Sequence, residues 1–307
     1  FASTRVSEVG LLAGSGADLI TSRRNPLVRR LRSLATATGR RQDGHLLLEG
    51  THQLQELMKL NQDRSRPLQV IATPAWLESH QELMRTLAGA VNVQPMADEA
   101  LRAALSTVNP DGVASLWPTD QLPVPSDHPS FVLALDRIQD PGNLGTLLRT
   151  ALAADIEQVW LAAGADPLAP KVVRSAVGAV LRLPLRRLGL TDSIGVEQLS
   201  SELIQARERG LQVVATLVPE SATGLSVVPY WQLDWRRPTV LVLGNEGSGL
   251  HPALQACCSH GVILPHSSGV ESLNVAAAAV PLLLERRRAI WWPPSAATSP
   301  RPSSARG

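Results

Sequence analysis

Short apolar runs alternate with longer amphipathic segments through the second half of the chain. Six apolar runs predict buried strands, at residues 131–135, 158–162, 182–187, 211–217, 239–243 and 261–264. The segments between them have the apolar spacing of helices, at residues 144–154, 170–178, 196–208, 250–257 and 273–288. Strands that alternate with helices in this way predict an α/β fold, with a mainly parallel sheet covered by helices on both faces.

The first half of the chain repeats this pattern more weakly. Residues 21–117 predict a small α/β domain, with helices at 26–37, 51–60 and 75–87 and strands at 44–49, 68–72 and 91–93. Four prolines between residues 118 and 130 predict a linker before a second domain at 131–290. We expect a flexible N-terminus at 1–20 and a disordered tail at 291–307, where small residues and prolines replace the apolar pattern.

The distribution of charge along the chain is more informative than the net charge. The net charge of +2 points to no class of partner, and the 44% of apolar residues with only 3% aromatics predicts a core of Leu, Val and Ala. Residues 23–41, however, hold seven arginines, and residues 171–187 hold five basic residues, with no acidic residue in either segment. Such segments favour contacts with phosphates. Solvated surface with snorkelling arginines is the alternative.

The two cysteines indicate the cellular compartment and disfavour a disulfide or a metal site. Cys257 and Cys258 are adjacent, which predicts reduced thiols in a cytoplasmic protein rather than a disulfide or a metal site. We therefore expect no bound metal. No apolar run reaches the length of a membrane span and no signal-peptide pattern follows Phe1, so we expect no membrane association.

Polar stretches follow three of the predicted strands. After residues 131–135 comes a polar turn, and we expect the next helix to open with Asn143 as its N-cap, six residues before Arg149. The strand at 239–243 ends in a glycine-rich turn, and the strand at 261–264 ends in a loop before the last helix. Ligands bind at the carboxyl ends of strands in open α/β folds, so these stretches predict a site.

The glycine-rich turn does not match the common nucleotide-binding patterns. Gly244 and Gly249 have the spacing of two glycines in a phosphate-binding loop, but Leu250 and His251 stand where that loop requires Lys and Ser or Thr. Pro252 stands where a dinucleotide fingerprint has its third glycine. A nucleotide-binding α/β enzyme of another class is therefore disfavoured.

Together the three stretches resemble the motifs of the SpoU (TrmH-like) RNA ribose 2′-O-methyltransferases of the SPOUT superfamily. In the family's order and spacing, over about residues 130–290, they are similar to Asn-x-Gly-x-x-x-Arg, Gly-x-Glu-x-x-Gly, and Pro followed seven residues later by Ser-Leu-Asn-Val. The matching residues are Asn143, Gly145, Arg149, Gly244, Glu246, Gly249, Pro265 and Ser272, Leu273, Asn274 and Val275. Residues 22–29 and 46–50 are similar to the family's N-terminal substrate-binding domain.

The resemblance implies the SPOUT α/β-knot, in which the C-terminal segment threads a loop and builds a pocket for S-adenosyl-L-methionine. The cofactor-binding residues that it implies are Leu243, Gly244, Gly249, Ile263, Leu264, Pro265, Ser272 and Leu273. The catalytic residues that it implies are Arg149, Asn143, Glu246, Ser272 and Asn274. For Ser272 and Asn274, a role as helix caps only is the alternative.

Several of these residues have chemistry that refines their expected roles. For Arg149 we favour contact with the phosphate beside the target ribose, because a free guanidinium holds its proton too tightly to act as a general base. His266 stands where the family usually has an apolar residue, and Gly269 lies one place later than the family's glycine; we expect the His266 ring to face solvent. The arginines predicted to bind RNA are Arg23, Arg24, Arg29, Arg30, Arg40 and Arg41.

The implied activity is methylation of a ribose 2′-hydroxyl in structured RNA. We expect ribosomal RNA rather than tRNA, because N-terminal domains of this kind accompany the rRNA enzymes more often. A tRNA methyltransferase and a non-catalytic RNA-binding ribosome-assembly protein are the alternatives. We also expect a homodimer through the C-terminal domain, as the family implies, because the final helix is apolar on nearly every side over residues 273–284. Burial of that helix within one chain is the alternative.

Overall fold

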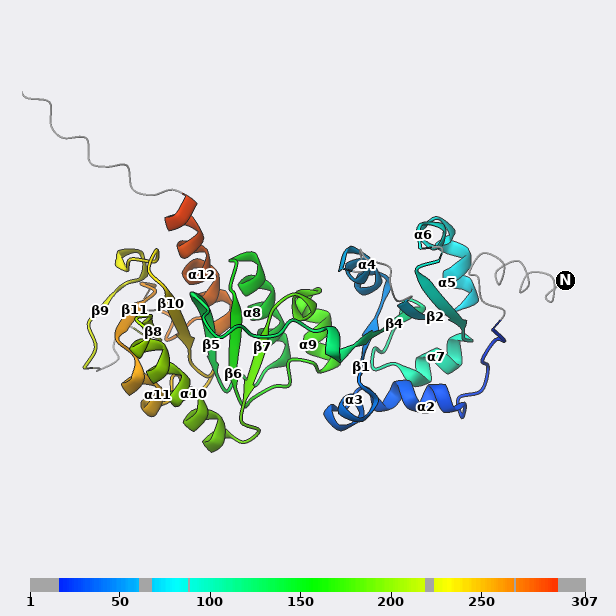
Figure 1. Cartoon of the computed structure of the whole chain (residues 1–307), viewed down its shortest axis with the longest axis horizontal. Helices are drawn as coiled ribbons and strands as arrows, with labels where there is room; N and C mark the ends of the chain where they lie inside the picture. The colour runs from blue at the N-terminus through cyan, green and yellow to red at the C-terminus, as the bar shows by residue number, and fades with distance from the viewer. Residues whose placement is uncertain (1–16, 61–67, 88, 219–223, 268, 292–307) are drawn as a thin grey trace, which may run out of the picture.

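The computed structural model describes residues 17–60, 68–87, 89–218, 224–267 and 269–291. Figure 1 shows two domains side by side along the long axis, the N-terminal one in blue to cyan and the C-terminal one in green to red. The predicted flexible N-terminus and disordered tail lie mostly outside the described residues. Within them, Ile20 forms a β-bridge with Met96, and Trp291 ends the last helix. No helix of the described chain is long and apolar enough to cross a membrane.

The N-terminal domain is built on a four-stranded mixed sheet in the order β1-β4-β2-β3. Its strands are β1 (His45–Glu49), β2 (Leu68–Ala72), β3 (Val91–Pro95) and β4 (Val113–Pro118). Its helices are α2 (Pro26–Ser33), α3 (Ala37–Asp43), α4 (Thr51–Leu60), α5 (Pro74–Ser79), α6 (Gln81–Thr86) and α7 (Asp98–Ala104), and a 3-10 turn, η1 (Thr119–Gln121), follows β4. Strand β4 pairs antiparallel with both β1 and β2, and neither β4 nor α7 was predicted.

The helix predicted over residues 26–37 ends at Ser33, and a second helix that was not predicted, α3, begins at Ala37 after a sharp turn. Thr36 caps α3, its hydroxyl accepting a hydrogen bond from the N–H of Gly39 at 3.0 Å. A Cβ on Gly39 would lie only 2.0 Å from the carbonyl oxygen of Ser33. A glycine at this position therefore allows a turn that apolar periodicity does not reveal.

The C-terminal domain is built on a seven-stranded sheet in the order β7-β6-β5-β10-β8-β11-β9, with every pair of neighbours parallel. Its strands are β5 (Phe131–Asp136), β6 (Gln158–Ala162), β7 (Leu185–Leu188), β8 (Gln212–Leu217), β9 (Val227–Pro229), β10 (Thr239–Leu243) and β11 (His260–Ile263). Its helices are α8 (Pro141–Ala153), α9 (Pro170–Ala176), α10 (Asp192–Glu208), α11 (Pro252–Cys257) and α12 (Val275–Trp291), with 3-10 turns η2 (Ala179–Leu181) and η3 (Tyr230–Gln232). The predicted parallel α/β fold is confirmed, and the short edge strand β9 was not predicted.

Helices cover both faces of this sheet, as the alternating side chains of β5 show. Phe131, Leu133 and Leu135 belong to the core cluster that holds residues of α8, α9 and α12. Val132 and Ala134 belong to a second cluster, with residues of α10 and α11. Because both faces are buried, the strand reads as a continuous apolar run rather than an alternating one.

Polar caps set the starts of the two helices that carry the first and third motifs. Helix α8 begins at Pro141 because Asp140, not Asn143 as predicted, is its N-cap, and an Asp140 carboxylate oxygen accepts from the Asn143 N–H at 2.8 Å. Helix α12 follows Asn274, whose side-chain oxygen accepts from the Ala276 N–H at 2.9 Å. The side chain of Asn143 is therefore not used as a cap.

The order of the strands brings the three motif loops to one edge of the sheet. Strands β5, β10, β8 and β11 are consecutive neighbours, and Leu243 at the end of β10 is in register with Leu135 of β5. The loops after β5, β10 and β11 therefore leave the sheet at its carboxyl edge, where ligands bind in open parallel sheets.

Candidate active site

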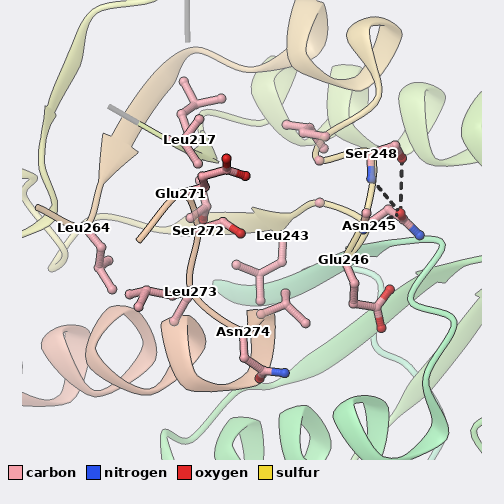
Figure 2. A pocket seen from close by; sticks show the side chains of 18 of the residues that line it. Leu217, Leu243, Asn245, Glu246, Ser248, Leu264, Glu271, Ser272, Leu273 and Asn274 are labelled. Carbon is pink, nitrogen blue, oxygen red and sulfur yellow. Dashed lines mark hydrogen bonds between the residues drawn. The ribbon is translucent and has the colours of Figure 1, made fainter. Parts of the chain in front are cut away.

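The motif loops border a cavity of about 640 Å³ beyond the ends of β8, β10 and β11 (Figure 2). Six predicted cofactor-binding residues line it: Leu243, Gly244, Gly249, Leu264, Ser272 and Leu273. Asn143, Glu246 and Asn274, which were predicted to be catalytic, also line it. Its lining is divided about equally between polar and apolar surface, and its volume is typical of a small-molecule or cofactor site.

Two predicted cofactor-binding residues lie outside this lining. The side chain of Ile263 packs against the core cluster on the α10 and α11 face of the sheet, and Pro265 is exposed. The lining residues that sequence reasoning missed include Thr216, Leu217, Val218, Gln255 and Glu271. The first three lie at the end of β8, and only the strand order, which places β8 between β10 and β11, could have indicated them.

Asn245 organises the glycine-rich turn, a role that the motif pattern did not suggest. Its side-chain oxygen accepts hydrogen bonds from the N–H groups of Gly247 at 2.9 Å and Ser248 at 3.0 Å, and Figure 2 shows the contact with Ser248. Its amide donates to the Arg137 carbonyl at 2.8 Å. A Cβ on Gly244 would lie 2.4 Å from the backbone nitrogen of Leu250. The turn therefore closes on itself only with glycine at 244.

Glu246 connects the second motif to the first. Its carboxylate accepts hydrogen bonds from the backbone N–H groups of Gln139 and Asp140, both at 3.1 Å, and from the side-chain amide of Asn143 at 3.3 Å. Burial raises the pKa of Glu246, but these and its own backbone hydrogen bond outweigh burial, so the pKa lies below its ordinary value. Glu246 is therefore a carboxylate that only accepts hydrogen bonds.

Asn143 joins Glu246 to the third motif. The side-chain amide of Asn274 donates to the side-chain oxygen of Asn143 at 3.0 Å, so a series Glu246–Asn143–Asn274 links all three loops beside the cavity. Asn274 is also the cap of α12, which means that the capping role and the site role coexist in one residue. Ser272 lines the cavity directly before it.

Arg149 lies apart from this series. It is exposed on α8, six residues after Asn143, and six steps of about 100° turn it roughly a third of a circle away. Its guanidinium has no hydrogen bond or ion pair within the part of the chain that the structure describes. The side chain is thus accessible to an external group.

Gly145 of the first motif serves helix packing rather than the cavity. A Cβ at this position would lie 1.8 Å from the hydroxyl oxygen of Ser175 in α9. That hydroxyl lies within hydrogen-bond distance of the carbonyl oxygens of Lys171 at 2.9 Å and of Pro141 at 3.3 Å. Glycine therefore allows α8 and α9 to approach closely, which a motif on one segment cannot show.

His266 lines the cavity, and the expectation that its ring faces solvent was wrong. The ring is half-buried, and its Nδ1 lies 2.7 Å from the Leu264 carbonyl oxygen. A carbonyl can only accept, so Nδ1 carries a proton in this contact. The hydrogen bond folds the ring back onto its own loop.

The arginines predicted to bind RNA fall into two groups. Arg40 is buried, and its guanidinium donates to the Leu34 carbonyl at 2.8 Å and to Asp166, so the prediction that it binds RNA was wrong. Arg30 pairs with Asp43 at 2.6 Å, and Arg23 pairs with Glu99 at 3.0 Å. Within the described residues, the exposed members without a side-chain partner are Arg24, Arg29 and Arg41.

Family models match both domains of the chain. The model of the SpoU rRNA Methylase family matches residues 130–283, which include the three motif loops. The model of the MRM3-like substrate binding domain matches residues 25–115, which include the four-stranded sheet except the end of β4.

Whole-chain comparisons agree with these matches. The chain is 40% identical over 262 residues to the uncharacterized tRNA/rRNA methyltransferase slr1673 of Synechocystis, covering 84% of this chain and 89% of that protein. It is 29% identical over 263 residues to the 23S rRNA (guanosine(2553)-2′-O)-methyltransferase RlmP of Bacillus subtilis, covering 85% and 95%. The crystal structure of AdoMet-bound rRNA methyltransferase from Sinorhizobium meliloti matches with a TM-score of 0.68 at 27% identity, covering 89% and 98%. The chain belongs to the SpoU rRNA methylase family.

Proposed function

We propose that this protein transfers a methyl group from S-adenosyl-L-methionine to a ribose 2′-hydroxyl in ribosomal RNA. The observation that carries the proposal is the series Glu246–Asn143–Asn274, which joins the three motif loops beside the cavity. The Bacillus subtilis and Sinorhizobium meliloti relatives are both named as rRNA methyltransferases, which favours ribosomal RNA over tRNA. A non-catalytic assembly protein is disfavoured because Asn143 and Arg149 are both present.

The cavity suits S-adenosylmethionine, which supplies the methyl group when bound. Leu243, Leu264 and Leu273 offer apolar walls for the adenine ring, and the turn 244–250 offers backbone donors and acceptors for its polar edges. Glycines at 244 and 249 keep that backbone uncovered, with Gly249 at a φ of 67°. These residues would hold the cofactor, whose methyl group would be the one transferred to the ribose oxygen.

The polar residues at the edge of the cavity receive the RNA in this proposal. Asn143 and Asn274 present amide groups to the target ribose, and Glu246 fixes their orientation by accepting from Asn143. Arg149 binds the neighbouring phosphate and orients the hydroxyl electrostatically. It does not take the proton, because a guanidinium stays protonated.

The N-terminal domain supplies further contacts with the RNA backbone. We assign these contacts to Arg24, Arg29 and Arg41, because they are exposed and their charges are not offset by a carboxylate partner. The match to an MRM3-like substrate binding domain over residues 25–115 supports this assignment.

We further propose a homodimer through α12. Val280, Leu284 and Trp291 are exposed apolar residues of α12, and with the exposed Ala277 they follow each other at steps of three, four and seven residues, the spacing of a coiled-coil seam that is interrupted at 287. Trp291 is 77% exposed, which a lone chain would leave in water. Light scattering at micromolar concentration should give twice 32.9 kDa, and Val280→Lys with Leu284→Lys should give 32.9 kDa. A wild-type monomer that still methylates RNA would refute this interface.

The two cysteines support a cytoplasmic location. Cys257 and Cys258 are both free and buried. Burial raises the pKa of the Cys258 thiol to about 12, so it is a poor nucleophile and has no tendency to form a disulfide. Buried free thiols suit a reducing compartment, and we place the enzyme there.

Methyl transfer in vitro tests the proposed activity. The purified protein, tritiated S-adenosylmethionine and ribosomal RNA from a strain that lacks the gene should yield labelled RNA, and nuclease digestion with mass spectrometry should identify a 2′-O-methylated nucleoside. A label on a base rather than a ribose, or on tRNA and not on ribosomal RNA, would contradict the proposal.

A further inference from the structure

Three ion pairs cross from the N-terminal domain to the C-terminal domain. They are Arg40–Asp166, Glu49–Arg174 at 3.3 Å and Glu56–Arg182 at 2.9 Å. The side chains of Glu49, Glu56 and Asp166 are only 4%, 11% and 24% exposed. Charges that are largely withdrawn from water interact more strongly than surface pairs, so these contacts resist separation of the domains.

The polarity of the pairs is mixed. The N-terminal domain supplies the cation of the first pair and the carboxylates of the other two. A displacement that brought like charges together would be unfavourable, so the three pairs select one relative placement of the domains. Close backbone contact adds to this, because Gln53 donates to the Val173 carbonyl at 3.3 Å and a Cβ on Gly178 would lie 3.2 Å from the Glu56 carboxylate.

Helix α9 connects this interface to the active site. Arg174 on α9 binds Glu49 of the N-terminal domain, while Ser175, the next residue, packs against Gly145 of α8. Helix α8 carries Asn143 in its first turn and Arg149 further along. The same helix therefore contacts both the substrate-binding domain and the helix of the first motif.

The loop before α9 makes a second connection. Asp166, which binds Arg40, lies one residue after Ala165, and the Ala165 N–H donates to the Ile138 carbonyl at 2.8 Å. The residue after Ile138 is Gln139, whose N–H binds Glu246. Both routes thus run from a domain-crossing ion pair to residues at the cavity through directly bonded or packed neighbours.

We propose that these three ion pairs, the interdomain clamp, fix the substrate-binding domain in one orientation, and that Glu56 and Arg182 are positioning residues for methylation of RNA. This inference rests on the proposed function. The clamp sets the distance between the free arginines of α2 and α3 and the cavity, so that RNA bound by one domain reaches the other in register. Arg174 and Arg182 of the basic segment 171–187 therefore hold the two domains together.

Reversal of one clamp charge tests the proposal. In Arg182→Glu two carboxylates would face each other across the interface, and we expect kcat/KM on ribosomal RNA from a gene-deleted strain to fall about tenfold, as for a coupled pair of about 1.4 kcal/mol. The dissociation constant for S-adenosylmethionine should not change. Arg186→Glu is the matched control, because Arg186 pairs with Glu202 at 2.7 Å inside the C-terminal domain.

The charge swap distinguishes positioning from direct RNA contact. Glu56→Arg combined with Arg182→Glu restores attraction across the interface, and we expect it to recover most of the lost kcat/KM. If the swap stays as impaired as Arg182→Glu alone, then Arg182 contacts the RNA itself and the proposal is wrong. An Arg182→Glu variant with the activity of the wild type would also overturn it.

A distance measured between the two domains tests the interdomain clamp in the absence of RNA. Spin labels at Glu82→Cys on α6 and Ser201→Cys on α10 report across the domains, because both positions are exposed and the native cysteines are buried. We expect one narrow distance distribution in the wild type, in Arg186→Glu and in the swap, and a broad one in Arg182→Glu. A broad distribution in the wild type would refute the clamp. Absence of methyl transfer with a narrow distribution would instead refute the proposed function alone.

Discussion

Two segments of this protein are both rich in arginine, but their arginines have different partners. In residues 171–187, all four arginines pair with carboxylates, as Arg174–Glu49, Arg182–Glu56, Arg186–Glu202 and Arg187–Asp166. In residues 23–41, Arg24, Arg29 and Arg41 are exposed without such a partner in the described chain. The carboxylates that pair with the later segment come from distant parts of the chain, so neither segment contains the information that separates them.

The partner of each guanidinium separates structural arginines from those that can bind an external group. A guanidinium bonded to a buried carboxylate holds structure, whereas an exposed one without a partner is available for a phosphate. The adjacent residues Arg40 and Arg41 belong to opposite classes. Arg149 belongs to the available class, although it lies on the helix of the first motif.

The largest effect should come from Arg149, the available arginine on the helix of the first motif. We expect Arg149→Ala to lower kcat on ribosomal RNA by about 100-fold to 1,000-fold, since it removes the charge that we assign to the phosphate beside the target ribose. Affinity for S-adenosylmethionine and the midpoint of urea unfolding should be unchanged, because the side chain is exposed and outside the core. Turnover near that of the wild type would show that Arg149 belongs with the structural arginines after all.

The next effect separates two neighbours on α3. Arg40→Met should lower the free energy of unfolding by about 3 kcal/mol, because it removes the buried donor to the Leu34 carbonyl and leaves the Asp166 carboxylate with only the more exposed Arg187 as its partner. Arg41→Met should change that free energy by less than about 0.5 kcal/mol. Urea denaturation of the two variants measures both values, and equal losses would erase the distinction between the two classes.

A smaller effect should appear in the salt dependence of RNA binding. Each phosphate contact contributes about 0.7–0.9 to the slope of log K against log salt concentration. Replacement of Arg24, Arg29 and Arg41 by Gln should therefore reduce the slope by about two units, measured by filter binding to ribosomal RNA. Arg186→Gln, from the paired segment, is the control and should leave the slope unchanged. A smaller slope in Arg186→Gln, with no change in the triple variant, would show that residues 171–187 rather than 23–41 contact the RNA phosphates.

The smallest effect should come from Glu246, the carboxylate at the cavity that accepts three hydrogen bonds from the first motif loop. The pKa of Glu246 is below its value in an unfolded chain, about 4.3, so its stabilising contribution is complete above that pH and is lost as pH falls through the folded value. The loss of unfolding free energy in Glu246→Gln should then be constant from about pH 6 to pH 7 and shrink below about pH 4. Urea titrations across this range measure it. A loss that grows in acid would mean that the carboxylate is not stabilised by its donors.

Periodicity predicted the C-terminal sheet well because its strands are buried on both faces and read as apolar runs. It missed β4 because Val113–Pro118 runs directly into the proline-rich segment, whose composition indicated a linker. It extended α2 to residue 37 and missed α3, because the turn between these helices depends on a close contact at Gly39. The order of the strands, which assembles the cavity, is not contained in the period of any one segment, and the knot was expected from the family resemblance alone.

The candidate site was predicted from three motifs. These motifs identified residues of the site more reliably than they identified the role of each residue. Asn143 was expected to cap a helix, but Asp140 does so, and Asn143 instead bonds to Glu246 and Asn274. Gly145 was matched to a motif, yet it serves packing against α9. These roles depend on side chains that are more than 100 residues apart in the sequence, or on the approach of two helices.

The most direct test of the account is a map of ribose methylation in cells. Sites of 2′-O-methylation should be mapped across total RNA from cells with the wild-type gene, without the gene, and with Arg149→Ala in its place. The account predicts at least one ribosomal RNA site that is methylated with the wild type and unmethylated in the other two. Identical maps from all three strains, or a lost site in tRNA alone, would contradict it.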